Sequence, residues 1–356
     1  MKNLFVVCLA LLGLTCCKKS DTTSTINNEA YYFPPNNSDV WETKAPLATW
    51  DAAKLEEAFT YAGTKKTYGM ILLHKGKIVK EQYWNGWTKS NRYPLNSATK
   101  SIVATVVGIA QQDGLLNIND RTNKYLGLGF TSAPLLKENL ITIKHQLSMT
   151  TGLDENVPDD NCITPSCLKF KADAGTRWYY YNAPYRLVQD VVAAASSKNF
   201  MDYANEKLLN KIGITTALNI NYIMYCNTRD AARFGSFILR KGEWNGTQIL
   251  TDKTYFNEMT NTSQSYNLSY GYLWWLNGKA STMAPASTLV FPTSLAPNAP
   301  ADMIMALGKD DKKIYVVPSL DIVVVRLGDD ATGSALLGPS SFDNDLWTKF
   351  KAALKY

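Results

Sequence analysis

The sequence from Ser97 to Gln112 reads SATKSIVATVVGIAQQ, and Gly114 follows two residues later. Its apolar residues recur at the spacing of one helix face, namely Ile102, Val103, Val106, Val107 and Ile109. This periodicity predicts a helix over residues 98–112, which Gly114 ends. Because apolar residues dominate the segment, we expect the helix to be buried.

Ser97 and Lys100 stand at the start of this helix. At a spacing of three residues both side chains lie on one face, within reach of each other. The helix dipole favours an alkoxide at this end, and burial lowers the pKa of a lysine so that a neutral amine can accept the serine proton. The pair therefore predicts a serine nucleophile with a lysine base. The alternative is an N-capping serine followed by a surface lysine.

The same Ser-x-x-Lys pattern occurs a second time, at Ser166 and Lys169. This copy overlaps a short loop, containing a proline, between Cys162 and Cys167, with no helix to hold the two side chains together. We expect no catalysis there. In an oxidising compartment the two cysteines are expected to form a disulfide, whereas Cys226 is expected to be a buried, inert thiol.

A second candidate group is the aromatic run Trp178-Tyr179-Tyr180-Tyr181-Asn182. Residues two apart in an extended segment point to the same side, so Tyr180 and Asn182 can face one site. A tyrosine near a lysine can carry a proton between nucleophile and leaving group. The alternative is ordinary packing of an aromatic cluster in the core.

Composition excludes several classes of protein. The chain has 356 residues, 46% of them hydrophobic, which is enough for a full-sized core. The net charge of +6 is spread along the chain, so no nucleic-acid partner is expected. His74 and His145 are far apart and form no metal-binding motif. Phosphate-loop, dinucleotide and Gly-x-Ser-x-Gly motifs are absent as well, so no metal and no other cofactor are expected.

The N-terminus predicts export. Residues 4–16 form an apolar run too short to span about 30 Å of hydrocarbon, so residues 1–17 are interpreted as a signal peptide. Residues 14–17 resemble a bacterial lipobox with Cys17 as the lipid-bearing residue; Cys16 is the other candidate, and an ordinary cleaved signal is the alternative. Residues 18–46, rich in Ser, Thr, Asn and Pro, predict a flexible tether. We therefore expect a lipid-anchored protein of the bacterial cell envelope.

The remaining chain, residues 47–356, is interpreted as one domain of mixed α/β (α+β) class. Strand patterns cover residues 70–73, 77–83, 271–276, 304–307, 313–317 and 321–327, and helical patterns include 185–195 and 230–239. Strands at the front and the back predict one antiparallel sheet built from both termini and flanked by helices. Residues 101–260 are expected to form a helical insertion on one side, and His74 to be a solvated turn residue.

Three motifs in order now support a family resemblance: SATKSI at 97–102, ITIKHQL at 141–147 before TGL at 151–153, and GTRW at 175–178 leading to Tyr180-Tyr181-Asn182. From about Trp50 to the C-terminus the chain resembles the serine β-lactamase and penicillin-binding-protein superfamily. It is most similar to the class C-like branch of esterases, D-aminopeptidases and 6-aminohexanoate-oligomer hydrolases. Three ordered motifs are far more specific than any one of them.

The resemblance implies roles for the motif residues. Ser97 would be the acylated nucleophile, Lys100 its base, Tyr180 a second base or acid, and Asn182 a hydrogen-bonding support for the substrate.

The third family motif, Lys-Thr-Gly, should fall at residues 308–311. Lys309 matches the cation of that motif and is a predicted substrate-binding residue, but Asp310 and Asp311 replace the hydroxyl residue and the glycine. By position, the oxyanion hole would combine the backbone N–H groups of Ser97 and Lys312. The missing Thr-Gly argues against high activity on β-lactams.

Together these features predict a serine hydrolase that cleaves an ester or amide bond in a small-molecule or peptide-like substrate. The rival class is a non-catalytic module of the same fold that binds cell-wall peptides. A Ser-His-Asp triad with His145 is an alternative mechanism, although its segment resembles a structural one in the family. Aromatic walls for a cleft could come from Tyr179, Tyr181, Trp274 and Trp275, and core packing is their alternative role.

Overall fold

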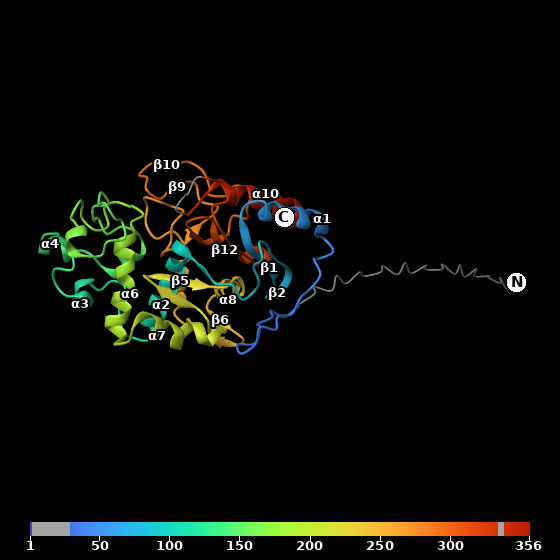
Figure 1. Ribbon diagram of the computed structural model, residues 1–356, viewed down its shortest axis with the longest axis horizontal. Coiled ribbons are helices and arrows are strands. Elements are labelled where there is room, and N and C mark those ends of the chain that lie inside the picture. Colours follow the sequence, from blue (N-terminus) through green and yellow to red (C-terminus); the bar gives the residue numbers. More distant parts are fainter. Residues whose placement is uncertain (2–28, 334–337) are drawn as a thin grey trace. The chain divides into compact units, whose positions relative to one another are not determined.

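A six-stranded antiparallel sheet organises residues 31–356 (Figure 1). In spatial order its strands are β2 (Lys77–Tyr83), β1 (Thr67–His74), β13 (Ile322–Gly328), β12 (Lys312–Val317), β11 (Ile304–Gly308) and β8 (Trp275–Leu276). Strand β1 from the front of the chain pairs with β13 from the back, which confirms the predicted sheet built from both ends. The computed structural model describes residues 29–333 and 338–356 besides Met1. The predicted signal peptide and the lipid site at Cys17 lie outside these residues.

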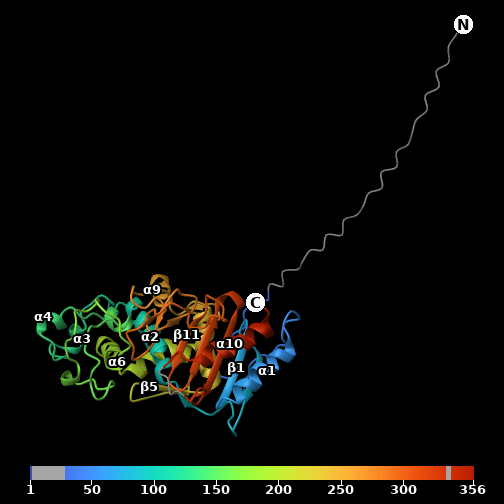
Figure 2. The same cartoon turned by 90° about the horizontal axis from the view of Figure 1, so that it is seen from above.

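Helices cover both faces of this sheet (Figures 1 and 2). They are α8 (Thr228–Leu239) on one face and α1 (Ala52–Gly63) with α10 (Ser341–Leu354) on the other. Gly235 of α8 lies against Ile314 of β12, whereas Asp343 of α10 accepts a hydrogen bond from the next residue, Lys313. Because successive strand residues point to opposite faces, the two helices must lie on opposite sides. The sequence analysis did not identify α1 and α10.

The helix predicted over residues 98–112 is α2 (Thr99–Gln112), entered through a single 3-10 turn, η1 (Asn96–Ala98). Every residue of α2 from Thr99 to Ala110 is buried, as expected from its apolar composition. No side chain caps η1 or the first turn of α2. The interpretation of Ser97 as an N-cap before a surface lysine is therefore wrong.

A second region adjoins the sheet and contains α3 to α7. These helices are α3 (Asn123–Leu126), α4 (Leu135–Glu138), α5 (Ile143–Leu147), α6 (Asn182–Ser196) and α7 (Phe200–Ala204). The region also contains a three-stranded sheet of β3 (Tyr93–Pro94), β5 (Ile223–Cys226) and β4 (Leu218–Ile220). It has its own small core, formed by Phe130, Ile141, Leu153, Leu168, Tyr181, Ala183 and Leu187.

The predicted helical insertion over residues 101–260 is therefore too long and not purely helical. Helix α8 packs on the main sheet rather than in the second region, because its apolar face lies against β12 and β13. Helix α9 (Lys253–Met259) packs against α2. The remaining short elements are η2 (Pro165–Cys167), a π-helical turn (Asn205–Leu209), η4 (Asn210–Ile212), β6 (Glu243–Trp244), β7 (Thr247–Gln248), β9 (Thr282–Met283), β10 (Val290–Phe291) and η5 (Pro318–Leu320). None of the helices among the described residues is long and apolar enough to cross a membrane.

The expected tether over residues 18–46 does not hold for residues 31–46, which pack against the domain. Trp41 is buried, and its indole Nε1 donates to the Gly76 carbonyl at 2.7 Å. Thr43 bridges Ile78 of β2, and the Arg233 guanidinium donates to carbonyls of this segment. Four aromatic residues among the polar ones, Tyr31, Tyr32, Phe33 and Trp41, supply the apolar surface that makes this packing favourable. The domain thus begins before residue 47.

Two local predictions also fail. The strand expected over residues 271–276 is limited to Trp275–Leu276, because Leu273 adopts a left-handed φ of 58° that no regular strand accommodates. His74 is buried rather than solvated, since it ends β1 and the turn is made by Lys75 and Gly76. Its Nδ1 lies 3.1 Å from the Nζ of Lys44.

Candidate active site

Ser97 and Lys100 lie side by side where η1 enters α2. The Nζ of Lys100 is 2.9 Å from the Oγ of Ser97, while the lysine is only 2% exposed. Burial lowers the pKa of Lys100 to about 7, and the nearby Arg186 guanidinium lowers it further, whereas the Asp160 carboxylate opposes the shift. Near neutral pH a large fraction of Lys100 is therefore the neutral amine that proton abstraction requires.

Two further predicted residues contact Lys100. Asn182, the first residue of α6, accepts a hydrogen bond from its Nζ at 2.8 Å. The Tyr180 ring lies 4.8 Å from the same atom. The Tyr180 hydroxyl is buried and has no hydrogen-bond partner among the described residues; burial raises its pKa, and the nearby Ser97 hydroxyl partly offsets this. The structure thus brings all four motif residues together.

The backbone before Ser97 is held by the end of β11. Asn96 adopts a left-handed φ of 48°, which asparagine tolerates better than most residues, and its Nδ2 donates to the Lys309 carbonyl at 3.1 Å. At Gly308 a Cβ would lie 2.2 Å from the Leu95 carbonyl oxygen, so only glycine allows β11 to come this close. The end of β11 therefore lies against the turn that carries the serine.

Ser97 opens into a cavity of about 530 Å³. It is lined by Asn96, Ser97, Lys100, Asp159, Asp160, Asn161, Asn182, Tyr185, Arg186, Asn221, Tyr222, Ile223 and Lys309. Sequence reasoning identified Ser97, Lys100, Asn182 and Lys309 in this group. It missed Asp160, Arg186 and Tyr222 because they lie on a loop, a helix and a hairpin turn that carry no motif. Only the cysteine pair beside Asp160 marked that loop as unusual.

The disulfide between Cys162 and Cys167 is confirmed. It closes the loop that follows Asp160, whose carbonyl accepts from the Ala183 N–H at 2.8 Å at the start of α6. Ser166, the serine of the second Ser-x-x-Lys pattern, is exposed in this loop, and its hydroxyl contacts that of Thr164. The second copy thus lacks the buried helix that holds Ser97 against Lys100.

The prediction for Lys312 is wrong, whereas Lys309 does line the cavity. Residues 309–311 form a tight hairpin turn in which Asp310 and Asp311 both adopt a φ of 58°, so that Lys312 pairs back with Gly308. The Lys312 side chain is buried, and its Nζ forms an ion pair with Asp310 at 3.1 Å. Lys309 thus lines the cavity together with Ser97, whereas Lys312 does not.

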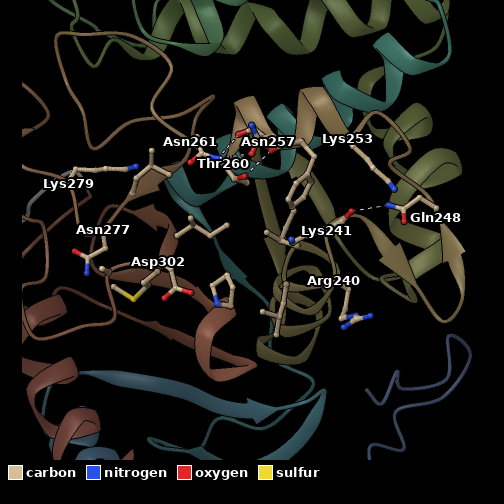
Figure 3. A pocket seen from close by; sticks show the side chains of 18 residues that line it. Arg240, Lys241, Gln248, Lys253, Asn257, Thr260, Asn261, Asn277, Lys279 and Asp302 are labelled. Atoms are coloured by element: carbon tan, nitrogen blue, oxygen red, sulfur yellow. Dashed lines mark hydrogen bonds between the residues drawn. The ribbon is translucent and has the colours of Figure 1, made fainter. Parts of the chain in front are cut away.

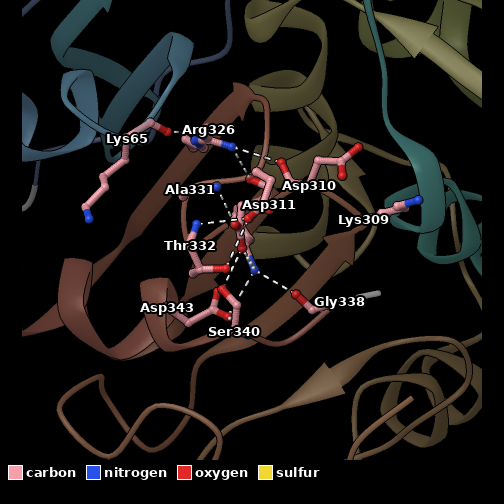
Figure 4. Close-up of polar contacts among 12 residues, drawn as sticks. Lys65, Lys309, Asp310, Asp311, Arg326, Ala331, Thr332, Gly338, Ser340 and Asp343 are labelled. Carbon is pink, nitrogen blue, oxygen red and sulfur yellow. Dashed lines mark hydrogen bonds and ion pairs between the residues drawn. The ribbon is translucent and has the colours of Figure 1, made fainter. Parts of the chain in front are cut away.

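Asp311 points away from the cavity, into a network of buried charges (Figure 4). Its carboxylate lies 3.1 Å from Lys313, which also contacts Asp343 of α10 at 3.0 Å. Burial acts to raise the pKa of Asp311, but the Lys313 ammonium and hydrogen bonds from its neighbours outweigh it and lower the pKa. Arg326 donates to the carbonyls of Asp310 and Asp311. The residue in place of the family glycine therefore puts no carboxylate in the cavity.

The alternative residues lie elsewhere. His145 caps α5, with its Nδ1 3.0 Å from the Thr142 hydroxyl, and it does not line the Ser97 cavity. Tyr181, Trp274 and Trp275 are buried core residues, and they and Tyr179 are absent from the cavity lining. The aromatic walls of the cavity are instead Tyr185 and Tyr222. Cys226 is a buried thiol, as expected.

A larger cavity of about 720 Å³ lies between α9 and the edge of the sheet at β8 (Figure 3). Its polar lining includes Arg240, Lys241, Lys253, Asn277, Lys279 and Asp302. None of Ser97, Lys100, Tyr180 and Asn182 lines it. Ser97, Lys100 and Asn182 line the smaller cavity. Tyr180 lines neither cavity and lies beside this one through its contact with Lys100.

Comparison with known proteins supports this assignment of the fold. The β-lactamase family model matches residues 53–220. An uncharacterised protein from Alkalihalophilus pseudofirmus is 22% identical over 299 residues, 72% of this chain and 82% of that protein. A candidate 6-aminohexanoate-dimer hydrolase from Bacillus anthracis has a similar structure, with a TM-score of 0.68 and 16% identity over 92% of this chain and 91% of that one. The structure of a D-stereospecific amidohydrolase from Streptomyces sp. is also similar, with a TM-score of 0.60 and 13% identity. The match covers 85% of this chain and 98% of that one.

Proposed function

This chain belongs to the serine β-lactamase and penicillin-binding-protein superfamily, and on that basis we propose that it hydrolyses an ester or amide bond through an acyl-enzyme on Ser97. The observation that carries the proposal is the 2.9 Å contact between Ser97 and a buried lysine whose pKa is lowered to about 7. A lysine placed to serve only as a cation would remain protonated at neutral pH. This lysine can act as a base.

In the proposed reaction the neutral Lys100 amine takes the proton from the Ser97 hydroxyl as its oxygen attacks the substrate carbonyl carbon. The oxyanion that forms is stabilised by the backbone N–H groups of Ser97 and Lys309, because Lys309 lines the cavity and Lys312 does not. Proton transfer through Tyr180 to the leaving group breaks the ester or amide bond and leaves the acyl-enzyme. Water then attacks the acyl carbon while Lys100 takes one of its protons. The bond between the acyl carbon and the Ser97 oxygen breaks, the carboxylic acid leaves, and the proton on Lys100 returns to the serine oxygen.

The substrate we propose is a small molecule or a short peptide-like amide or ester. The cavity of about 530 Å³ has the size of a small-molecule site, and Tyr185 and Tyr222 give it apolar walls. Two similar structures are described as a dimer hydrolase and an amidohydrolase, which favours amide substrates. The absence of Thr-Gly after Lys309 favours low activity on β-lactams.

Replacement of Ser97 tests this function. Ser97→Ala should abolish turnover of p-nitrophenyl acetate, because loss of a nucleophile typically costs on the order of 10³-fold or more. Ser166→Ala is the matched control, since it removes a hydroxyl from the other Ser-x-x-Lys pattern and should retain nearly full activity. Equal turnover by the wild type and Ser97→Ala would refute the proposal. A wild type that binds cell-wall peptides but never becomes acylated would instead support the non-catalytic module.

We also propose that the protein is exported and attached to a membrane of the bacterial envelope through Cys17. The support is the short apolar run and the lipobox-like residues 14–17. Expressed in a bacterial host, Cys17→Ser should move the protein from the membrane fraction to the soluble fraction, whereas Cys16→Ser should not. Membrane retention of the Cys17→Ser protein would contradict the lipid site.

A further inference from the structure

A chain of three hydrogen-bonding groups ends at the Ser97 hydroxyl. The Asn182 Nδ2 donates to the Asp160 carboxylate at 2.7 Å, and the Asn182 Oδ1 accepts from Lys100 at 2.8 Å. A carboxylate only accepts hydrogen bonds, whereas an amide has one donating and one accepting end. Turning the Asn182 amide over would bring its oxygen against the Asp160 oxygen. Asp160 therefore fixes which end of the amide faces the lysine.

The orientation of this amide determines where the lone pair of Lys100 points. A neutral amine has two N–H groups and one lone pair. When one N–H is given to the Asn182 oxygen, the lone pair is left to accept the Ser97 proton. With the amide turned over, its NH₂ group would donate to the lone pair and compete with Ser97. The correct orientation is thus a condition for base catalysis by Lys100.

The backbone around Asp160 is held on several sides. The Asp160 carbonyl accepts from the Ala183 N–H, and the next carbonyl, that of Asn161, accepts from Arg186 of α6 at 2.6 Å. The Cys162 N–H donates to the Asp159 carbonyl at 3.1 Å, and the disulfide to Cys167 closes the loop beyond it. Opening the disulfide would leave these hydrogen bonds as the remaining restraints on the loop.

From these contacts we propose that Asp160 is a positioning residue that directs the Lys100 amine toward Ser97, and that the Cys162–Cys167 disulfide holds it there. The inference rests on the proposed function and adds to it a residue outside the three family motifs. Asp160 does not react with the substrate; it acts through Asn182.

A pH profile distinguishes this role from a purely structural one. Lys100 is surrounded by the rings of Tyr180 and Tyr185, by Asn182, and by the opposing charges of Asp160 and Arg186. Acylation needs the neutral amine, so the rate rises with pH through the pKa of Lys100. Because the Asp160 charge raises that pKa, removing the charge should move the rise to lower pH.

The experiment compares Asp160→Asn, Asp160→Ala and Asp159→Asn in the full chain, with kcat/KM for a neutral ester measured from roughly pH 5 to 9. Asp160→Asn keeps an oxygen that can accept from Asn182 but no longer excludes the turned-over amide, so its plateau rate should fall less than that of Asp160→Ala, while the acidic limb moves down by at least about half a pH unit. Asp160→Ala loses the acceptor, and its plateau should fall at least about tenfold.

Asp159→Asn is the matched control. Asp159 also lines the cavity, but its carboxylate accepts from the Asn161 N–H and side chain within the loop. Its acidic limb should therefore stay at the wild-type pH. A wild type that turns over the ester beside an Asp160→Ala protein with the same plateau and limb would overturn the inference alone, whereas an inactive wild type would overturn the proposed function.

The disulfide is tested with Cys162→Ser/Cys167→Ser. Without the covalent closure Asp160 should be held less firmly, and the plateau rate should fall toward that of Asp160→Ala while thermal unfolding shows that the protein remains folded. In the Asp160→Ala background the same double substitution should lower the plateau rate little further, because the Asp160 carboxylate that the disulfide holds is already absent. Full activity of the double variant, or an equal fractional loss in both backgrounds, would remove the disulfide from the proposal.

Discussion

Lys100 carries an electrostatic cost that the rest of the site has to offset. The amine is buried against two tyrosine rings, and its pKa falls from 10.5 to about 7 in the folded protein. The folded state therefore binds fewer protons than the unfolded chain between these two pH values. The free energy of unfolding should therefore rise with pH across this window. The contribution that comes from keeping Lys100 neutral is fully present above the unfolded pKa and is lost as the pH falls to the folded pKa.

Replacing Lys100 by methionine should show this cost directly. Lys100→Met should be inactive yet more stable than the wild type at pH 7 by about 1–4 kcal/mol, because no charge has to be buried. The difference in free energy of unfolding should shrink as pH rises toward 10. Urea unfolding of both proteins at several pH values measures it. A constant difference across the range would show that Lys100 titrates normally.

Some of these residues could be predicted from sequence and others could not. The spacing of Ser97 and Lys100 on a helix is local, and so is that of Tyr180 and Asn182, so patterns within a few residues were sufficient. Asp160 and Arg186 reach the same cavity from a loop and from the second turn of α6, and their approach depends on tertiary packing. No local periodicity encodes such contacts. The only sequence signal near Asp160 was the cysteine pair.

Among the elements, the hairpin of β11 and β12 connects the cavity to the far face of the sheet. Its turn presents Lys309 to the cavity, while Asp311 and Lys313 extend toward α10 (Figure 4). Arg326 on β13 is completely buried and donates to both carbonyls of this turn. Buried charges thus hold the strand end that the proposed oxyanion hole uses.

Removing one charge of this network should destabilise the protein strongly. Asp343→Ala leaves the completely buried Lys313 with Asp311 as its remaining ion-pair partner and removes the acceptor of the Tyr315 hydroxyl. We expect a loss of about 3–5 kcal/mol in the free energy of unfolding. Asp345→Ala, on the exposed face of the same helix, should change it by less than about 1 kcal/mol. Equal urea midpoints for the two variants would contradict this.

Alternating or continuous apolar runs predicted β1, β2, β11, β12 and β13 to within a few residues, because strand periodicity is local. Strand β8 was overestimated because Leu273 takes a left-handed conformation imposed by its surroundings, where its N–H donates to the Leu147 carbonyl. The prediction for Lys312 was wrong for a similar reason. Asp310 and Asp311 form a turn in the left-handed conformation, which shifts the register of the strand that follows. The turn residues 309–311 include no asparagine or glycine that would have indicated this conformation from the sequence.

At the scale of the whole molecule, the average composition of residues 18–46 is polar and therefore did not indicate where the domain starts. Within that segment, however, Trp41 is buried and backbone carbonyls accept hydrogen bonds from the Arg233 guanidinium. Burial is decided by individual side chains, so a composition average cannot locate the boundary. The sheet built from both termini was predictable, because its strand patterns lie at the two ends of the chain.

Truncation tests the boundary. The reference is a chain that starts at Tyr31, which keeps the contacts of Trp41 and Arg233. A chain that starts at Leu47 should lose at least about 3 kcal/mol, because Trp41 and its aromatic neighbours are gone and Arg233 loses the carbonyls of residues 34, 35 and 38. Urea denaturation of the two truncated proteins provides the comparison. Equal free energies of unfolding for the two truncated proteins would support the prediction that the tether extends to residue 46.

The most direct test of the proposed chemistry is single-turnover acylation of Ser97 by an activated ester, followed by mass spectrometry of the trapped protein. Lys100→Arg should acylate at a negligible rate, because a guanidinium stays protonated at any working pH. His145→Ala should acylate at close to the wild-type rate if it folds, since His145 caps α5 away from the cavity. A Lys100→Arg protein that acylates normally, beside a folded His145→Ala protein that does not, would contradict the serine–lysine mechanism and restore the triad.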